Sequence, residues 1–390
     1  MSKILIIILA FCSSALYGQD INTVLSEIET NHPGLQAALK ENQARAKEHK
    51  TTLQPPNPEV EYGYFPGNTS AVGTKKVFGV SQRFAFPTEY KSRKGMSEAR
   101  TSYDQAEYHE LRRKKLLEAK ILLLRYVYHR HQLKTANQHL EWTVKFREDI
   151  KKLYEKGSVP GLDVSKARMQ VTRARNEKRK LESKIRSDSI QILMMNNRHQ
   201  LSGLYKLEYP PLRDAGRESF IEEYITHHPR KQIALANQNK SNSKTRLRKN
   251  AYLPDLKVGW ESEQVFDESH RGFKAGITLP LWEKRHTISS VKLANEAAKL
   301  QLQAVSNQLE AEAASSWTEW QTLKSIYLDY QKSLQEYDRP EKIRRAYQKR
   351  EISSTALFYE LETYFELKRE LIDYQFMAYK AQAKLFSFAL

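Results

Sequence analysis

The stretch Asn57-Pro58-Glu59-Val60-Glu61-Tyr62-Gly63-Tyr64 returns in altered form as Leu253-Pro254-Asp255-Leu256-Lys257-Val258-Gly259-Trp260, an offset of 196 residues from Pro58 to Pro254. The dipeptide His32-Pro33 recurs at the same offset as His228-Pro229. A duplication of this size predicts two copies of one supersecondary layout. The predicted organisation is a signal peptide at 1–18, a first structural repeat at 19–212 and a second structural repeat at 213–390.

Both copies of this stretch alternate apolar and charged residues with the period of a β-strand, and a second alternating segment follows each. The side chains predicted on the apolar faces are Val60, Tyr62, Tyr64, Phe84, Phe86, Val258, Trp260, Ile277 and Leu279. Those predicted on the polar faces are Glu59, Glu61, Arg83, Lys257, Glu261 and Lys274. Such strands suit a half-buried sheet, and equally a membrane barrel with apolar residues toward lipid and polar residues toward the lumen. Four strands cannot close a barrel, because the smallest barrels need about eight, so several copies of the chain would have to contribute.

The rest of each copy has helical periodicity. A helix opened by His-Pro is predicted at about 20–52 and again at about 217–250, since proline suits the first turn of a helix. A very long helix follows each strand pair, at about 88–156 and 285–350, and a tight turn then leads to a return helix. At ~1.5 Å per residue such a helix approaches ~100 Å, which suits a tube spanning the periplasm better than a globular core.

The N-terminal segment has the pattern of a secretory signal, with Lys3 before the apolar run Ile4 to Phe11. Cys12 is the only cysteine, so the mature chain is expected to have no disulfide and no thiol chemistry. The formal charge of +18 is spread along helical faces among glutamates, and we expect no nucleic-acid partner for an exported protein. No internal stretch reaches the roughly 18–20 apolar residues of a spanning helix, so any membrane span would consist of strands.

No catalytic pattern is present in the sequence: there is no phosphate-binding glycine loop, no nucleophile elbow and no His-Glu-x-x-His. We therefore predict no enzyme activity, no cofactor and no metal site. His129 and His131 are two residues apart on a predicted helix, where they do not face each other, and are expected to be solvated. His228, which precedes Pro229, is expected to cap a helix.

Taken together, the ordered motifs resemble those of the TolC-like outer-membrane efflux channel family. The segments that carry the resemblance are Gly79 to Phe84, Gly276 to Leu281, the turn Tyr154 to Gly157, Leu162-Asp163-Val164 and Ala167-Arg168, within the duplicated layout. Asn57-Pro58-Glu59, Phe84-Ala85-Phe86-Pro87 and the length of 390 residues are more similar to the heavy-metal (CusC/CzcC-like) branch.

The resemblance implies a mainly α fold with a small β part. Duplicated long α-helical hairpins would form a coiled-coil tunnel, and four strands from each protomer of a homotrimer would complete a twelve-stranded barrel in outer-membrane lipid. The implied function is a passive duct for small molecules or metal cations, coupled to a periplasmic adaptor and an RND-type inner-membrane pump. An exported coiled-coil scaffold or adhesin without a pore is the alternative, and it gives no reason for exposed apolar strand faces.

The resemblance also implies a constriction at the periplasmic tip. By position, Tyr347 matches the gate tyrosine of the family and Asp163 the aspartate after the first turn. Arg350 replaces the glycine of the second turn. The aspartates expected further along are replaced by residues such as Ala356 and Tyr359, and Glu360 is the candidate substitute for one of them.

Overall fold

The structure is a computed structural model that describes residues 21–69, 72–201, 203–213, 215–266, 268–280, 286–337 and 340–390. The predicted signal peptide at 1–18, which contains Cys12, lies outside the described residues, as does Leu281. The chain divides into two compact units. Unit 1 comprises the described parts of Met1–Pro33, Leu116–Asp214 and Glu319–Lys384, and unit 2 those of Gly34–Lys115, Ala215–Thr318 and Leu385–Leu390. Both units draw on both halves of the sequence, and the boundary between the repeats at 212–213 stays a prediction.

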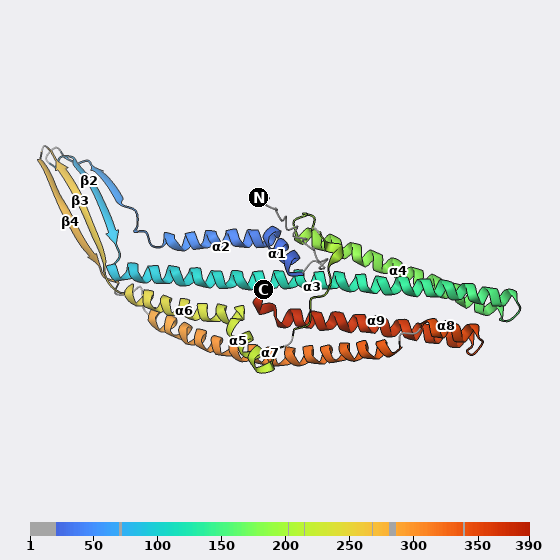
Figure 1. The fold of residues 1–390 in the computed structure, drawn as a ribbon. Coiled ribbons are helices and arrows are strands. Elements are labelled where there is room, and N and C mark those ends of the chain that lie inside the picture. Colours follow the sequence, from blue (N-terminus) through green and yellow to red (C-terminus); the bar gives the residue numbers. More distant parts are fainter. Residues whose placement is uncertain are drawn as a thin grey trace, which may run out of the picture. The chain divides into compact units, whose positions relative to one another are not determined.

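Helices dominate the described residues, and the predicted order of helix, strand pair, long helix and return helix occurs twice (Figure 1). The elements in chain order are α1 (Ile21–Asn31), α2 (Pro33–Thr51), β1 (Glu59–Phe65), β2 (Lys75–Phe84), α3 (Pro87–Glu155), α4 (Gly161–Met195), the 3-10 turn Leu204–Lys206, α5 (Arg217–His227), α6 (Pro229–Asn250), β3 (Asp255–Val265), β4 (Glu268–Thr278), α7 (Thr287–Tyr337), α8 (Pro340–Gln348), α9 (Ser354–Leu385) and the 3-10 turn Ser387–Ala389. This architecture confirms the predicted mainly α fold with a small β part.

The longest element, α3, is a single helix of 69 residues, which corresponds to about 100 Å. Across the described ranges, no helix combines the length and the apolar character needed to cross a membrane.

Two of the predicted helices are interrupted at a proline, and a third is described as two helices on either side of residues 338–339. The two predicted to contain His-Pro are divided at His32 and His228, which separate α1 from α2 and α5 from α6. The predicted helix at 285–350 ends as α7 at Tyr337, and α8 begins at Pro340. At the His-Pro sites the reason is steric: a residue that precedes proline is pushed out of the α-helical region toward extended backbone, as His228 shows with φ −65° and ψ 126°.

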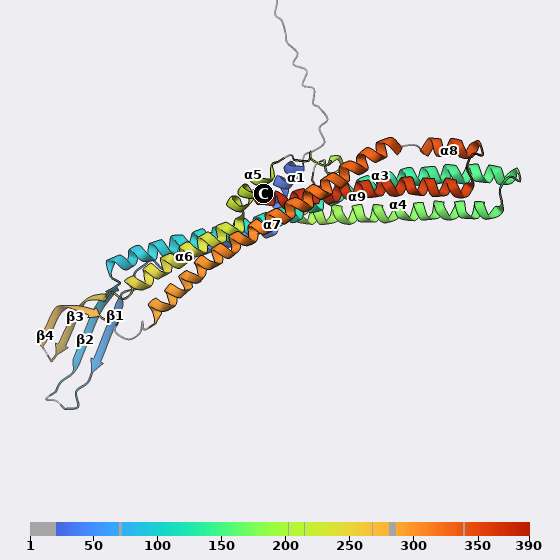
Figure 2. The same cartoon turned by 90° about the horizontal axis from the view of Figure 1, so that it is seen from below.

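Unit 2 contains a four-stranded antiparallel sheet with the order β1-β2-β3-β4 (Figure 2). The strand pairs of the two sequence copies are joined side by side through β2 and β3, where Phe84 lies opposite Leu256. Within the described residues β1 and β4 are edge strands, each hydrogen-bonded to a neighbour on one side only. Such edges present unpaired backbone groups that can receive a strand from another chain.

The helical part of unit 2 is held by an aromatic cluster around α5. Phe220 is buried and its ring lies within 6.1 Å, centroid to centroid, of the rings of Trp317, Phe386 and Phe388. His228 is also buried, and its Nδ1 accepts a hydrogen bond from the backbone N–H of Arg230 at 3.1 Å. The histidine therefore caps α6, as predicted.

Unit 1 is built around the antiparallel pair of α3 and α4, which run side by side in both views (Figures 1 and 2). The predicted apolar seam of the return helix is confirmed, because Ala167, Val171, Ala174 and Leu181 are buried along one face of α4. A second apolar cluster fills the end of the unit where the helices turn. Its buried members are Phe146, Ile150, Ala167, Tyr347, Leu357, Leu361, Tyr364 and Phe365.

Candidate functional site

The register of the sheet in unit 2 places most of the large apolar strand residues on one face, although Phe65 and Val77 lie on the other face and Lys76 and Arg271 on this one. Residues directly opposite each other in paired strands share a face, so the row Val60, Val80, Trp260 and Phe273 crosses all four strands on the same side. These side chains are not covered by the chain itself: Phe273 is 93% exposed and Val60 is 65% exposed. The predicted apolar-face residues that lie on this face within strands are Val60, Tyr62, Tyr64, Phe84, Val258, Trp260 and Ile277.

Two residues predicted on the apolar strand faces lie just outside the strands. β2 ends at Phe84 and β4 ends at Thr278, so Phe86 and Leu279 fall in the connections that follow. Each of these two residues precedes a proline, Pro87 or Pro280, which has no backbone N–H to donate to a ladder.

The opposite face of the sheet is charged. Glu59, Glu61, Arg83, Lys257, Glu261 and Lys274 all lie on this face. Their charges pair across strands: Lys257 Nζ lies 2.9 Å from Glu59 Oε2, and Lys274 contacts Glu261. The sheet is thus mainly apolar on one side and ion-paired on the other, a distribution that suits a wall between lipid and water.

The two tight turns of unit 1 have the same hydrogen-bond pattern. After α3, the N–H of Gly157 donates to the carbonyl of Tyr154 and that of Ser158 to the carbonyl of Leu153, both at 2.8 Å. After α8, the N–H of Arg350 donates to the carbonyl of Tyr347 and that of Glu351 to Ala346. This is the Schellman arrangement, which requires a left-handed residue at its centre.

The central residues of these turns differ. Gly157 has φ +68°, and Arg350 takes the corresponding conformation at φ +61°. Glycine adopts this conformation without steric cost, whereas an L-residue with a Cβ does not. Arg350 is exposed on the surface of the turn.

Tyr347, the candidate gate residue, packs inside the apolar cluster of unit 1. Its side chain is 5% exposed, and its hydroxyl has no hydrogen-bond partner among the described residues. Burial raises the pKa of the Tyr347 hydroxyl, and the nearby carboxylates of Asp163 and Asp149 raise it further. The hydroxyl is therefore neutral at physiological pH, and the role of Tyr347 as a gate stays a prediction.

The other candidate tip residues take different positions. Asp163 is buried, and its Oδ2 accepts a hydrogen bond from the hydroxyl of Ser354 at 2.6 Å, which joins the start of α4 to the start of α9. Glu360 lies on α9 and is partly exposed. The structure brings Asp163 close to Tyr347, but Arg350 lies outside the apolar cluster that buries this tyrosine.

Sequence reasoning missed the ion pair that ties α3 to α8. Arg344 Nε lies 2.9 Å from Asp149 Oδ2, and the two residues are 195 positions apart. No local pattern marks this pair, because each residue sits among several other charged side chains.

The prediction that His129 is solvated is wrong. His129 is buried, and its Nδ1 lies 2.6 Å from Asp188 Oδ2 on α4, a carboxylate that Arg125 also contacts. The apolar packing of α3 against α4 buries the imidazole. His131 is partly exposed and lies 2.9 Å from Glu208.

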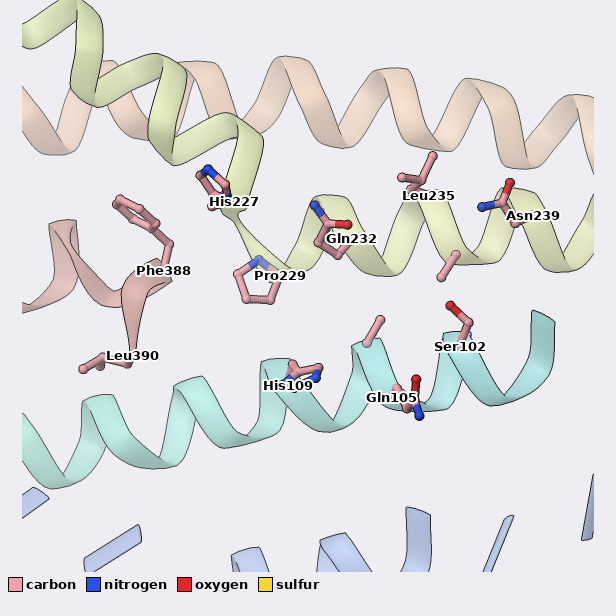
Figure 3. A pocket seen from close by; sticks show the side chains of 12 residues that line it. Ser102, Gln105, His109, His227, Pro229, Gln232, Leu235, Asn239, Phe388 and Leu390 are labelled. Atoms are coloured by element: carbon pink, nitrogen blue, oxygen red, sulfur yellow. The ribbon is translucent and has the colours of Figure 1, made fainter. Parts of the chain in front are cut away.

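A cavity of about 430 Å³ opens between α3 and α6 in unit 2 (Figure 3). Amide and imidazole groups, including His109, His227, Gln232 and Asn239, line it together with Phe388. None of the residues predicted for a site lies in it. In the ranges that the structure describes, no group of three or more histidine, cysteine, aspartate or glutamate side chains is placed to hold a metal ion.

Comparison with solved structures shows that the chain shares its fold, with long helical hairpins that occur twice and a four-stranded antiparallel sheet joining the two copies, with outer-membrane channel proteins. No protein-family model and no curated protein sequence matches the chain.

Three of the similar structures show how far the likeness extends. The outer-membrane protein VceC of Vibrio cholerae superimposes with a TM-score of 0.76 at 15% identity, over 94% of this chain and 95% of that chain. CusC gives 0.77 at 15% identity, over 94% and 91%. The CmeC outer-membrane channel of Campylobacter jejuni gives 0.75 at 14% identity, over 94% and 85%. The predicted resemblance to TolC-like channels is thus confirmed at the level of the fold.

Proposed function

We propose that this chain is the outer-membrane component of a tripartite efflux system, a passive trimeric duct that carries small molecules or metal cations out of the cell. In this proposal three copies contribute four strands each to a twelve-stranded barrel in outer-membrane lipid. The helical hairpins form the periplasmic tunnel. A periplasmic adaptor and an RND-type inner-membrane pump supply the cargo and the transport energy.

The observation that carries the proposal is the sheet of unit 2. It has one exposed apolar face, one ion-paired face and two edge strands, β1 and β4. A monomer in water would leave this apolar face and both edges uncovered, which favours aggregation. Lipid against the apolar face and neighbouring copies against the edges remove both problems. The exposed apolar face also argues against the alternative of a scaffold or adhesin without a pore.

The likeness to channel structures supports the duct but not a particular cargo. CusC and VceC match the chain at the same identity, so the comparison does not separate the heavy-metal branch from others. The cargo stays open between small molecules and metal cations, and the resemblance to the heavy-metal branch stays a prediction. Growth of a deletion strain on copper, on zinc and on a drug panel tests that branch: sensitivity confined to drugs would contradict it.

A matched pair of arginine substitutions tests insertion. Val258 lies on the apolar face of β3 and Ser81 on the polar face of β2. Val258→Arg should oppose insertion by about 2–4 kcal/mol if the residue lies near the bilayer midplane, because the charge meets hydrocarbon. Ser81→Arg introduces the same side chain on the lumen side and should insert like the wild type. The measurement is the yield of assembled trimer in the outer-membrane fraction.

Conductance provides the second measurement. Lys274→Ala, on the polar face, should leave trimer yield unchanged and alter single-channel conductance, since it removes a charge from the lumen. Equal yields for Val258→Arg and Ser81→Arg would refute the assignment of faces. A wild-type protein that remains a dissolved monomer would refute the proposed function altogether.

A further inference from the structure

A basic groove lies between α3 and α6 in unit 2, next to the sheet. Its volume is about 600 Å³. The lining residues that carry the argument are Lys91, Lys94 and Gly95 of α3 and Arg246, Lys249 and Asn250 of α6. Four cationic side chains thus face a single acidic one, Glu98.

The cations of this groove are largely uncompensated. Lys94 lies 4.0 Å from Glu98, at the limit of an ion pair, and both side chains are about 70% exposed, so screening by water makes the contact weak. Lys91, Arg246 and Lys249 make no ion pair with any residue that the structure describes. Water screens the mutual repulsion of these exposed cations, but an anion bound in the groove is attracted by all four of them.

Two further features shape the groove. A Cβ added at Gly95 would meet no atom within 4 Å, so this glycine leaves open space in its wall. At the end near the sheet, Asn250 Nδ2 donates hydrogen bonds to Ser92 Oγ at 2.5 Å and to the carbonyl of Thr88 at 3.3 Å. These bonds fix the spacing of α3 and α6 where the groove begins.

The groove begins where the strands end. Phe84, the last residue of β2, pairs with Leu256 of β3, which in turn pairs with Ile277 of β4. These three residues form the last row of the apolar face. Lys91 follows Phe84 by seven residues and lies one turn into α3, and Lys249 precedes the first residue of β3 by six, so the cations follow closely on this row along the chain. A lipid headgroup lies directly beyond the hydrocarbon region that its acyl chains occupy, in a layer about 5–8 Å thick on each side.

We propose that this groove binds the phosphate headgroup of an anionic phospholipid whose acyl chains cover the apolar face of the sheet. The inference rests on the proposed function, because it requires the sheet to be inserted in a membrane. Arginine and lysine side chains are the usual ligands of lipid phosphates, and basic pockets at a membrane boundary select anionic headgroups.

The test measures lipid retained by the full-length mature protein in detergent, by native mass spectrometry. The probes are dioleoylphosphatidylglycerol, dioleoylphosphatidylcholine and inorganic phosphate. In the groove variant, Lys91, Lys94, Arg246 and Lys249 are each replaced by glutamine. The matched control replaces four exposed arginines of α4 by glutamine: Arg168, Arg175, Arg179 and Arg186.

We expect the wild type to retain phosphatidylglycerol about tenfold better than phosphatidylcholine, and the groove variant to lose this preference. The α4 variant should keep it, although it loses the same number of charges. Gly95→Trp fills the groove without changing charge and should also abolish the preference. Gly95→Ala, which only places a methyl group in open space, should leave it intact.

Three outcomes would overturn the lipid site: equal loss in the groove and α4 variants, no loss in the groove variant or Gly95→Trp, or displacement of the lipid by an equal concentration of inorganic phosphate. Flotation of the wild type with phosphatidylglycerol vesicles separates this inference from the proposed function. Insertion without headgroup preference refutes the lipid site alone. Failure of the wild type to insert refutes the proposed function.

Discussion

Removing the hydroxyl of Tyr347 should stabilise the second tight turn. The ring of Tyr347 packs in the apolar cluster of unit 1, while its hydroxyl is buried without a hydrogen-bond partner among the described residues. Tyr347→Phe keeps the ring and removes only the unsatisfied oxygen. The substitution therefore tests whether the tyrosine acts through its ring packing or through its polar group.

The size of the effect follows from the cost of an unpaired buried group. Leaving a polar group buried and unsatisfied costs about 1–3 kcal/mol, so Tyr347→Phe should raise the free energy of opening the turn by about 1 kcal/mol. That change slows amide exchange about fivefold. Tyr347→Ala removes the ring as well, and should lower the stability of the cluster by about 3–5 kcal/mol.

The assay is amide hydrogen exchange at the turn of the detergent-solubilised protein. The N–H groups of Arg350 and Glu351 report on it directly, since they donate to the carbonyls of Tyr347 and Ala346 at 3.0 and 2.9 Å. Tyr359→Phe is the control, because Tyr359 is 70% exposed and its hydroxyl is solvated. Faster exchange in Tyr347→Phe would refute the reasoning: the hydroxyl would then have a partner, such as a neighbouring copy.

Three further predictions concern single residues. Arg350→Gly should stabilise the turn after α8 by about 1 kcal/mol, and Gly157→Ala should destabilise the turn after α3 by a similar amount, because only glycine adopts a positive φ freely. Amide hydrogen exchange at each turn measures the two effects. The pKa of His228 is lowered to about 4, chiefly by burial and also by the charge of Arg113. Between pH 6.5 and pH 4 this histidine is therefore protonated in the unfolded chain but neutral in the folded one, so the free energy of unfolding should fall by up to about 3 kcal/mol over this range. In His228→Asn the melting temperature should depend less on pH over the same range. Ser354→Ala should destabilise the start of α9 by about 1.5–3 kcal/mol, because it removes the hydrogen bond to a buried carboxylate. Ser354→Thr keeps a hydroxyl and should not destabilise it. Amide hydrogen exchange at the start of α9 measures the difference between the two variants.

The strand faces were predictable because the alternation of side chains in a strand is local. Once Val60 and Tyr62 are assigned to one side, Glu59 and Glu61 must lie on the other, whatever the strand pairs with. The structure adds the register, which aligns the apolar sides of all four strands. Register depends on contacts between segments far apart in the chain, so no local sequence pattern predicts it.

The helix boundaries differ from the prediction at the His-Pro sites. The sequence predicts that His-Pro opens one helix, whereas His32 and His228 each separate one helix from the next, which proline opens. The steric restriction on the residue before proline outweighs the helical periodicity around it.

The polar links of unit 1 could not be predicted. Asp149 with Arg344, and Asp163 with Ser354, join residues about 190 positions apart. Each of these side chains has charged or hydroxylated neighbours in the sequence, and only the packing of the helices selects one partner. His129 illustrates the same limit, since its burial depends on how α4 lies against α3.

Arg350 departs from the rule that glycine occupies the left-handed position of a Schellman turn. Its turn has the same hydrogen bonds as the turn at Gly157, so the backbone demands the same left-handed residue, but a side chain with a Cβ occupies the position. A strained residue persists only where the surrounding packing determines the backbone, and here the buried ring of Tyr347, three residues earlier, anchors the helix end. The arginine therefore contributes nothing to the stability of the turn that glycine would not provide better.

What it adds is an exposed positive charge at this turn. In the proposed duct the turn lies at the periplasmic mouth, so Arg350→Gly should stabilise the turn and at the same time change the ion selectivity of the channel.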